Sequence, residues 1–338
     1  MPAAGRDVHD CPRDTGMIYN LAMARILKAA LGFVVLFSTC LIGRAQAPRA
    51  VPAKGLPEVH LRVDTSLVLV PVHATSKTGT SITDLTEENF QVFEDGVEQK
   101  VAYFSKQDAP LSVGLVFDSS GSMTHKIRKS AEAAAAFFKT ANAGDEFFLI
   151  EFGERPKLIM PFTTDSDQVY RKIVQSRPFG RTSLIDAIHL ALLQMKNARN
   201  ARKAIVILSD GGDNRSRLTR REIKGALVES DVQMYAMGIF DRDDVAKHTP
   251  EEENGPRLLD DLAAQTGGRV YPVDNLDDLE SISTTLGNAL RNEYLLGYVP
   301  LNESRDGKYR QVRVRLVLPD EKPKLNITYR HGYYAPAQ

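Results

Sequence analysis

The sequence predicts an α/β protein with a doubly wound, mostly parallel six-stranded sheet, flanked by a small β-sandwich. In residues 109–292, short apolar runs alternate with segments of helical periodicity, which is typical of a parallel sheet covered by helices on both faces. After this region, apolar residues recur at every second position, as in half-buried antiparallel strands, and before it an apolar run at residues 67–72 and a predicted hairpin also indicate strands. A length of 338 residues is enough for two such domains.

Six apolar runs of strand length predict the strands of the central sheet: residues 113–117, 147–152, 158–162, 204–208, 233–239 and 270–273. Apolar residues at helical spacing predict helices between them. Two of these series begin at Leu184 and Leu279, and another comprises Ile127, Ala131, Ala134 and Phe138. Thr219 and Glu222 form a capping-box pattern, which predicts the start of a further helix.

The flanking segments, residues 58–108 and 293–338, carry β signals. In the first, Asp95-Gly96 separates two alternating runs and predicts a tight hairpin turn, because both residues tolerate positive φ. Each flank is too short to bury a comfortable core alone. We therefore predict that the two flanks pair with one another and that the α/β domain is inserted between them. Two separate small sheets, formed in chain order, are the alternative.

Residues 1–47 have the layout of a secretory signal region. Arg25 and Lys28 precede the uncharged residues 29–42, and the small-x-small pattern Ala45-Gln46-Ala47 follows. The apolar stretch is shorter than the roughly 20 residues of a membrane span, so we expect cleavage and export to the periplasm, the cell envelope or the medium. A retained membrane anchor is the alternative. Residues 48–57 contain three prolines and predict a linker.

Composition narrows the classes of function. Lys and Arg together number 43, as do Asp and Glu, so the basic excess of nucleic-acid-binding proteins is absent. The only cysteines, Cys11 and Cys40, precede the expected cleavage site, so the mature chain would form no disulfide. A lipoprotein that uses Cys40 and a true start at Met17 or Met23 are further alternatives for this end of the chain.

Oxygen-bearing side chains gather in three predicted loops. Asp118, Ser120 and Ser122 follow the first central strand at positions i, i+2 and i+4, Thr182 precedes a helix, and Asp210 follows a later strand. Ligands of open α/β sheets bind beyond the carboxyl ends of the strands, so we expect these loops to converge. Carboxylate and hydroxyl oxygens suit a hard cation such as Mg²⁺, whereas zinc prefers nitrogen and sulfur.

Each loop alone also has a simpler interpretation. Ser120 and Ser122 would serve as caps of the helix that begins near Lys126, and Thr182 would serve as an N-cap. Asp210, followed by two glycines, would form an ordinary turn. The coincidence of all three loops favours a common site.

Taken together, these residues resemble the metal-ion-dependent adhesion site of the von Willebrand factor type A (VWA) domain. That motif is Asp-x-Ser-x-Ser, a distant Thr, and a distant Asp that is usually followed by Gly. Every position is matched here, by Asp118, Ser120, Ser122, Thr182 and Asp210. The resemblance covers residues 109–292. The flanking segments, with Glu94-Asp95-Gly96 and Gly332-Tyr333-Tyr334, look like those of a bacterial exported subgroup called von Willebrand factor A-related.

The resemblance implies a metal-dependent protein-binding module for adhesion or assembly, and not an enzyme. The three hydroxyls would bind Mg²⁺ directly, and Asp118 and Asp210 would hold it largely through water; Mn²⁺ and Ca²⁺ are other possible occupants. The ion would then capture an exposed Asp or Glu of a partner protein. Candidates for contacting that partner are residues near the same face: Arg181, Asp241, Asp243 and Asp244, the last three in a loop that also holds residues 251–253.

Two other classes of function stay open. The first is a hydrolase that uses Asp118, Asp210 and a metal; no His-Glu-x-x-His pair, Gly-x-Ser-x-Gly elbow or phosphate-binding Gly-rich loop supports it. The second is a structural envelope protein whose metal site is incidental. Partner binding that is unchanged by a chelator would indicate the second.

Overall fold

The computed structural model describes residues 67–77, 79–106, 109–240, 250–319 and 324–337. The predicted signal region and linker, and the candidate partner-binding residues Asp241, Asp243 and Asp244, lie outside these ranges. None of the helices within them is both long enough and apolar enough to pass through a membrane.

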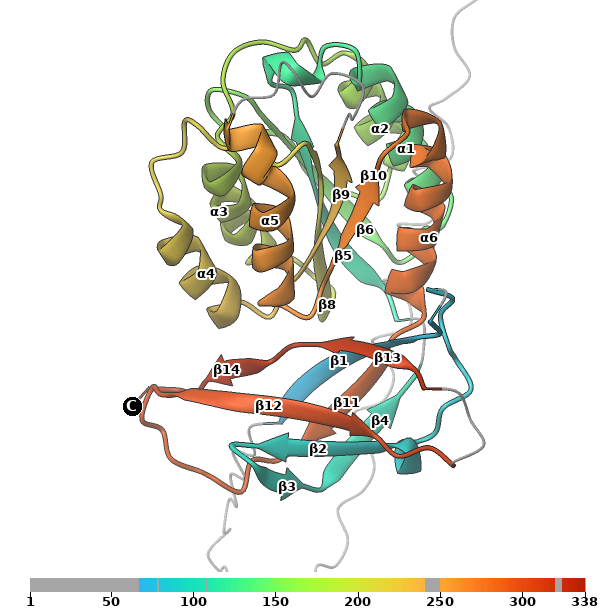
Figure 1. Ribbon diagram of the computed structural model, residues 1–338, viewed down its shortest axis with the longest axis vertical. Coiled ribbons are helices and arrows are strands. Elements are labelled where there is room, and N and C mark those ends of the chain that lie inside the picture. The colour runs from blue at the N-terminus through green and yellow to red at the C-terminus, as the bar shows by residue number, and fades with distance from the viewer. Residues whose placement is uncertain (1–66, 78, 107–108, 241–249, 320–323, 338) are drawn as a thin grey trace, which may run out of the picture. The chain divides into compact units, whose positions relative to one another are not determined.

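The central domain contains one six-stranded sheet with the strand order β10-β9-β8-β5-β6-β7 (Figure 1). Its strands are β5 (Leu111–Asp118), β6 (Glu146–Phe152), β7 (Lys157–Thr163), β8 (Arg202–Ser209), β9 (Gln233–Ile239) and β10 (Val270–Val273). All neighbours are parallel except β7, which runs antiparallel to β6. The predicted mostly parallel six-stranded sheet is confirmed.

Helices cover both faces of this sheet (Figure 1). One face carries α1 (Ile127–Phe138), α2 (Ser166–Val174) and α6 (Leu279–Arg291), and the other carries α3 (Leu184–Met195), α4 (Arg220–Glu229) and α5 (Pro250–Ala264). Adjacent residues of β5 serve opposite faces: Phe117 belongs to the first apolar cluster and Val116 to the second. Burial on both faces explains why the central strands are apolar almost throughout.

Helix α5 corrects the sequence interpretation, which placed residues 251–253 in a loop. They lie in the first turns of α5. The run Asn254-Gly255-Pro256 is a turn signal, and Pro256 sits inside the helix. Leu259 and Leu262 are fully buried against the sheet, and this packing outweighs the poor helix propensity of the segment. Helix α2 also went unpredicted, whereas α4 begins with the expected capping box.

The two flanks form two four-stranded sheets, β13-β1-β11-β4 and β14-β12-β2-β3. The strands are β1 (Val68–Thr75), β2 (Phe90–Glu94), β3 (Val97–Gln99), β4 (Val101–Ser105), β11 (Tyr294–Tyr298), β12 (Tyr309–Leu316), β13 (Asn326–Tyr329) and β14 (Gly332–Tyr334). β1 pairs with β11 and β13, and β2 pairs with β12, so each sheet combines both flanks. Pairing between the flanks is confirmed, and separate sheets in chain order are excluded.

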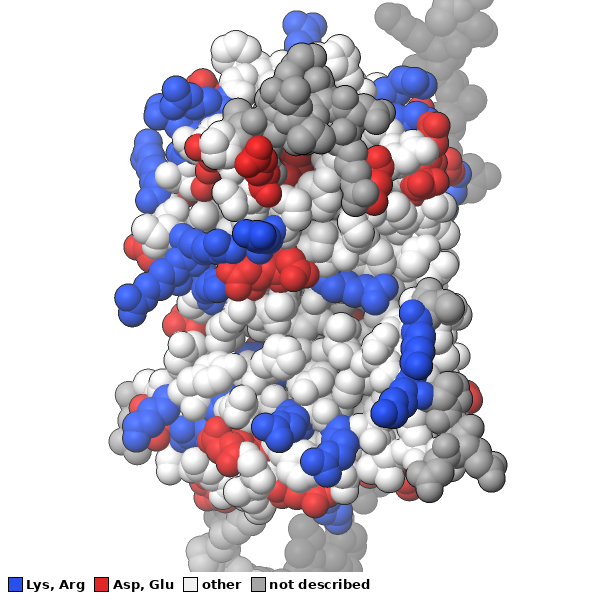
Figure 2. Space-filling model, viewed as in Figure 1, with Lys and Arg blue, Asp and Glu red and all other residues white. Residues whose placement is uncertain are grey.

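Both sheets bury their inner faces in one apolar cluster, to which β1, β2, β11 and β12 contribute. The hairpin turn between β2 and β3 is as predicted, with φ of 48° at Asp95 and 85° at Gly96. Lys100 separates β3 from β4, which belong to different sheets. Basic and acidic side chains are mixed on the face drawn in Figure 2, in line with the zero net charge.

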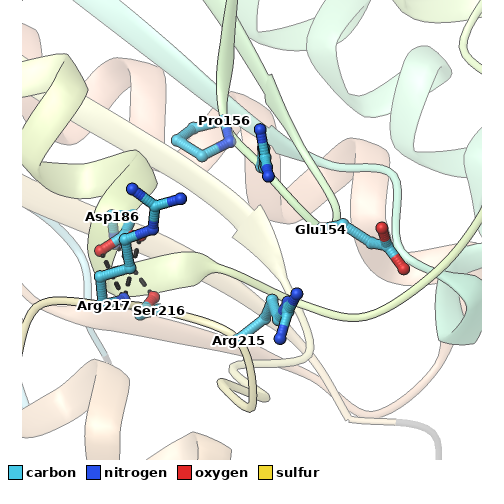
Figure 3. A pocket seen from close by; sticks show the side chains of 7 residues that line it. Glu154, Pro156, Asp186, Arg215, Ser216 and Arg217 are labelled. Atoms are coloured by element: carbon cyan, nitrogen blue, oxygen red, sulfur yellow. Dashed lines mark hydrogen bonds between the residues drawn. The ribbon is translucent and has the colours of Figure 1, made fainter.

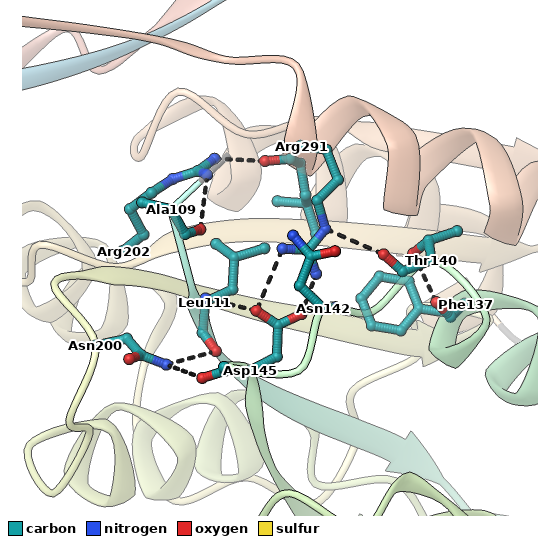
Figure 4. Close-up of polar contacts among 11 residues, drawn as sticks. Ala109, Leu111, Phe137, Thr140, Asn142, Asp145, Asn200, Arg202 and Arg291 are labelled. Atoms are coloured by element: carbon teal, nitrogen blue, oxygen red, sulfur yellow. Dashed lines mark hydrogen bonds and ion pairs between the residues drawn. The ribbon is translucent and has the colours of Figure 1, made fainter. Parts of the chain in front are cut away.

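A buried polar network lies at the amino ends of the central strands (Figure 4). Asp145, just before β6, accepts hydrogen bonds from the backbone N–H groups of Leu111 and Asn142, each at 2.8 Å. Its two carboxylate oxygens also pair with the guanidinium of Arg291, at the end of α6. One carboxylate therefore ties together the start of β5, the turn before β6 and the last turn of α6.

We expect Asp145→Asn to lower the free energy of unfolding by about 3 kcal/mol, because it leaves the Arg291 guanidinium without its buried partner. Urea unfolding followed by circular dichroism measures the change. The control is Arg128→Gln, which removes the exposed pair with Glu132 on α1 and is expected to change stability by less than about 0.5 kcal/mol. Equal losses in the two variants would contradict the importance of the Asp145 network.

His73 in β1 should make the protein sensitive to mild acid. Burial, and then the charge of Arg269, lower the pKa of His73 from 6.5 to about 4. Between these values the unfolded chain binds the extra proton, so stability is full above pH 6.5 and falls as the pH drops toward 4, by up to about 3 kcal/mol. Unfolding measured from pH 7 to pH 4 should show a flatter dependence in His73→Gln, whereas the exposed control His125→Gln should follow the wild type. Parallel curves for all three proteins would refute this assignment.

Candidate metal site

Three loops meet at the carboxyl ends of β5 and β8. These strands are neighbours, and the chain runs from β5 to β6 on one side before it returns to β8 on the other. The order of the strands therefore reverses at β5, which is the usual position of a ligand site in an open α/β sheet. The register pairs Phe117 with Leu208, so the residues that follow them, Asp118 and Ser209, lie at the same level.

Asp118, in the first loop, is fully buried. One carboxylate oxygen, Oδ1, accepts a hydrogen bond from the Ser120 N–H at 2.9 Å, and Oδ2 accepts one from the Ser209 hydroxyl at 2.6 Å. The hydroxyl oxygens of Ser120 and Ser122 lie 3.1 Å apart, with Ser120 buried and Ser122 exposed. The first loop thus holds a buried carboxylate, which the Ser120 N–H bonds, and two hydroxyls that contact each other.

The second loop, which holds Thr182, is bound to both of the others. Gly121 N–H of the first loop donates to the carbonyl of Gly180 at 3.1 Å, and Gly180 has φ of +81°, which favours glycine. Thr182 N–H donates to the Asn214 side chain at 3.1 Å, and the Thr182 carbonyl accepts from the N–H groups of Asn214 and Arg215. Thr182 itself is buried and is held between the first and third loops.

The third loop presents Asp210, which is 5% exposed. Its Oδ1 accepts a hydrogen bond from the Gly212 N–H at 3.1 Å, whereas Oδ2 is buried and has no hydrogen-bond donor among the described residues. The nearest described cation is the Lys126 ammonium, at 3.9 Å from Oδ2. A buried carboxylate oxygen without a donor is unfavourable unless a cation or water completes its surroundings.

Gly211 shows that this loop is closely confined by α5. Its φ is +82°, and a Cβ there would lie 2.6 Å from the carbonyl oxygen of Gly255 in α5. Gly255 is similarly confined, since its Cβ would lie 2.3 Å from the Asp210 carbonyl oxygen. The helix that the sequence analysis missed therefore packs directly against the candidate site.

The turn interpretation of Asp210 matches its hydrogen bond from the Gly212 N–H, but the capping interpretations of Ser120, Ser122 and Thr182 do not match the observed contacts. The N-cap of α1 is Lys126 and that of α3 is Ser183, and no side-chain cap hydrogen bond forms at either position. Ser120 precedes a short 3₁₀ turn, again without a side-chain cap. The hydroxyls of Ser120 and Ser122 pair with each other, so capping does not account for them.

The electrostatics of Asp118 suit a cation. Burial, and then the charge of Asp210, raise the pKa of Asp118 to about 7. A nearby positive charge would favour the ionised form of this carboxyl group. Hydroxyl and carboxylate oxygens are the donors that a hard divalent ion prefers, and Oδ2 of Asp210 is a buried oxygen with no hydrogen-bond donor among the described residues. In the described part of the chain, no three His, Cys, Asp or Glu residues group as a metal cluster, so a zinc-type site gains no support there.

A hollow of about 500 Å³ borders the site on the Thr182 side (Figure 3). It is lined by the arginines Arg155, Arg215 and Arg217 together with Glu154 and Asp186. The Arg215 N–H donates to the Thr182 carbonyl at 2.9 Å, so the hollow is contiguous with the second loop. Asp186 accepts hydrogen bonds from the N–H groups of Arg217 and Leu218, and the carboxylates of Asp186 and Glu154 offset two of the three arginine charges. Arg181, the other predicted partner-binding residue, is exposed beside Thr182.

Sequence reasoning overlooked three residues that shape the site. Ser209 bonds Asp118, Asn214 holds Thr182, and Lys126 faces Asp210. Ser209 and Asn214 lie near Asp210 in sequence, so their proximity was a usable signal. Lys126 offered none, because a lysine at the start of a helix is ordinarily solvated.

Comparison with known proteins identifies the family of the central domain. Residues 113–212 match the von Willebrand factor type A domain family. The α/β domain is a VWA domain. A curated, uncharacterized protein of Borreliella burgdorferi is 22% identical over 152 residues, which is 41% of this chain and 45% of that protein. The match therefore spans less than half the length of that relative.

Solved structures of VWA domains are also similar to this chain. The von Willebrand factor type A protein from Catenulispora acidiphila is 13% identical, with a TM-score of 0.46, over 73% of this chain and 75% of the other. The vWF domain of the type V pili tip protein Mfa5 from Porphyromonas gingivalis is 13% identical, with a TM-score of 0.43, over 54% and 95%. At such values, neither structure assigns an activity to this chain.

We expect Asp118→Ala to abolish the calorimetric signal of Mg²⁺ binding while the domain stays folded, because the variant removes a buried carboxylate whose ionisation burial disfavours. Circular dichroism checks the fold. Asp213→Asn is the matched control: Asp213 lies in the same loop but bonds Ser216 and the Ile185 N–H at the start of α3, so Mg²⁺ binding should persist. Unchanged binding in Asp118→Ala would remove these residues from consideration as metal ligands.

Proposed function

We propose that this protein is an exported, metal-dependent protein-binding module in which the VWA site captures an acidic residue of a partner protein. The observation that carries this proposal is the buried, unbonded Oδ2 of Asp210 beside the buried carboxylate of Asp118. Two carboxylates in an enclosed site need positive charge, and oxygen donors select a hard divalent cation for that role.

Each residue has a defined part in this proposal. The hydroxyls of Ser120, Ser122 and Thr182 would bind Mg²⁺, and Asp118 and Asp210 would hold it through water. A divalent cation with few direct carboxylate ligands retains positive charge and accepts one more anionic oxygen. The hydrogen bonds of Ser209, Asn214 and Gly121 keep the loops in place, so the site is organised before a partner arrives.

The surroundings of the site favour an acidic partner. In the hollow next to Thr182 three arginines (Arg155, Arg215 and Arg217) outnumber two carboxylates (Glu154 and Asp186), and Arg181 is exposed beside Thr182. Guanidinium groups bind carboxylates with two parallel hydrogen bonds, so acidic side chains near the captured residue would gain further contacts. Such rim charges speed association and select partners more than they raise affinity.

We place this activity outside the cytoplasm. The support is the signal-like layout of residues 1–47.

The proposed function predicts partner capture that requires the metal. Immobilised wild-type protein should retain specific proteins from an envelope extract in Mg²⁺ and release them in EDTA, while Asp118→Ala should retain none of these and Asp213→Asn should retain all of them. Replacing Asp or Glu by Asn or Gln in the partner should then identify a single residue that reduces binding by tenfold or more. Retention that is indifferent to both EDTA and Asp118→Ala would rule out the metal-dependent mechanism.

A further inference from the structure

Lys126 is a buried lysine at the edge of the metal site. It is the N-cap of α1 and is 8% exposed, and no other lysine among the described residues is buried. Its ammonium lies 3.9 Å from Oδ2 of Asp210 and 3.5 Å from the carbonyl oxygen of Ile239. Lysine is rarely buried unless it is paired, so this position calls for a reason.

The pair between Lys126 and Asp210 has an unusual form. The distance of 3.9 Å exceeds a hydrogen bond, and Oδ2 of Asp210 is the atom that lacks a donor. A buried ion pair stabilises the fold most when it includes a direct hydrogen bond, and this pair lacks one. Here the ammonium supplies charge to the site and still leaves the carboxylate oxygen available to another cation.

We propose that Lys126 is a built-in counter-charge of the metal site, which supports the two buried carboxylates when metal is absent and limits the affinity for the divalent ion when it is present. This inference rests on the proposed function, since it assigns a role within the same site. Lys126 acts through Asp210 and is a positioning residue, not a metal ligand.

Charge balance shows what Lys126 changes for a partner. Asp118 and Asp210 carry two negative charges, a divalent ion carries two positive charges, and Lys126 adds one more. The loaded site therefore has one positive charge left, which a single carboxylate of a partner neutralises. Without Lys126 the loaded site would be neutral and would attract an acidic residue less strongly.

The test uses Mg²⁺ alone as the probe. The variant Lys126→Met keeps an unbranched side chain but removes the ammonium, and with it the repulsion of the divalent ion. Calorimetry should therefore show Mg²⁺ binding that is at least about tenfold tighter than in the wild type. In EDTA the same variant should melt at a lower temperature than the wild type, because two buried carboxylates have lost their counter-charge. A residue with only a packing role would not produce these opposite effects.

Three further variants make the result decisive. Lys126→Arg retains the charge and should match the wild type in both measurements. Lys129→Met is the control on the same helix, where Lys129 pairs with Asp277 and Glu132 away from the site, and its Mg²⁺ affinity should be unchanged. If Lys126→Met does not fold, Lys126→Gln replaces it in the Mg²⁺ titration, because glutamine is also neutral but is polar.

The outcomes separate this inference from the proposed function. If neutral variants of Lys126 bind Mg²⁺ with the wild-type affinity or more weakly, while Asp118→Ala abolishes binding, the counter-charge role is wrong and the metal site stands. If Asp118→Ala leaves Mg²⁺ binding intact, the metal assignment itself is wrong, whatever Lys126 does.

Discussion

Parallel pairing of β5 with β8 is the constraint on which the site depends. The two strands come from distant parts of the chain, and their register places the last residue of one at the level of the last residue of the other. The Ser209 hydroxyl then bonds the Asp118 carboxylate across the two strand ends. A shift of one residue would turn every side chain of β8 to the opposite face and would break this contact. The apolar clusters on both faces hold that register.

Burial of the two carboxylates sets the electrostatics of the site, and it makes their ionised forms unfavourable unless positive charge or hydrogen-bond donors surround them. Asp118 and Asp210 are nearly inaccessible, and the raised pKa of Asp118 shows that its ionised form is disfavoured there. Backbone N–H groups, Ser209 and Lys126 provide partial compensation. One buried oxygen, Oδ2 of Asp210, still has no hydrogen-bond donor among the described residues. A cation at this oxygen would compensate for the cost of burying it. In the proposed function, stability and metal affinity are therefore linked through the same two carboxylates.

Most of the architecture was predictable because its signals are local. Strands buried on both faces produce continuous apolar runs, and the six runs correspond to β5 to β10. The Asp95-Gly96 turn was predictable because few residues tolerate positive φ. Helix α5 was not, since Asn254-Gly255-Pro256 opposes helix formation locally and only the packing of Leu259 and Leu262 on the sheet outweighs it. Pairing of the flanks followed from their size and not from any local pattern.

The sequence by itself determined the candidate set of oxygen-bearing side chains. Strand ends and a helix start bring the loops of Asp118, Ser120, Ser122, Thr182 and Asp210 to one edge of the sheet. The tertiary structure decided how those oxygens are occupied. Whether a carboxylate oxygen finds a donor, and whether a lysine is solvated or enclosed, depends on packing between segments far apart in the chain. That is why the open oxygen of Asp210 and the enclosed ammonium of Lys126 became visible only in the folded protein.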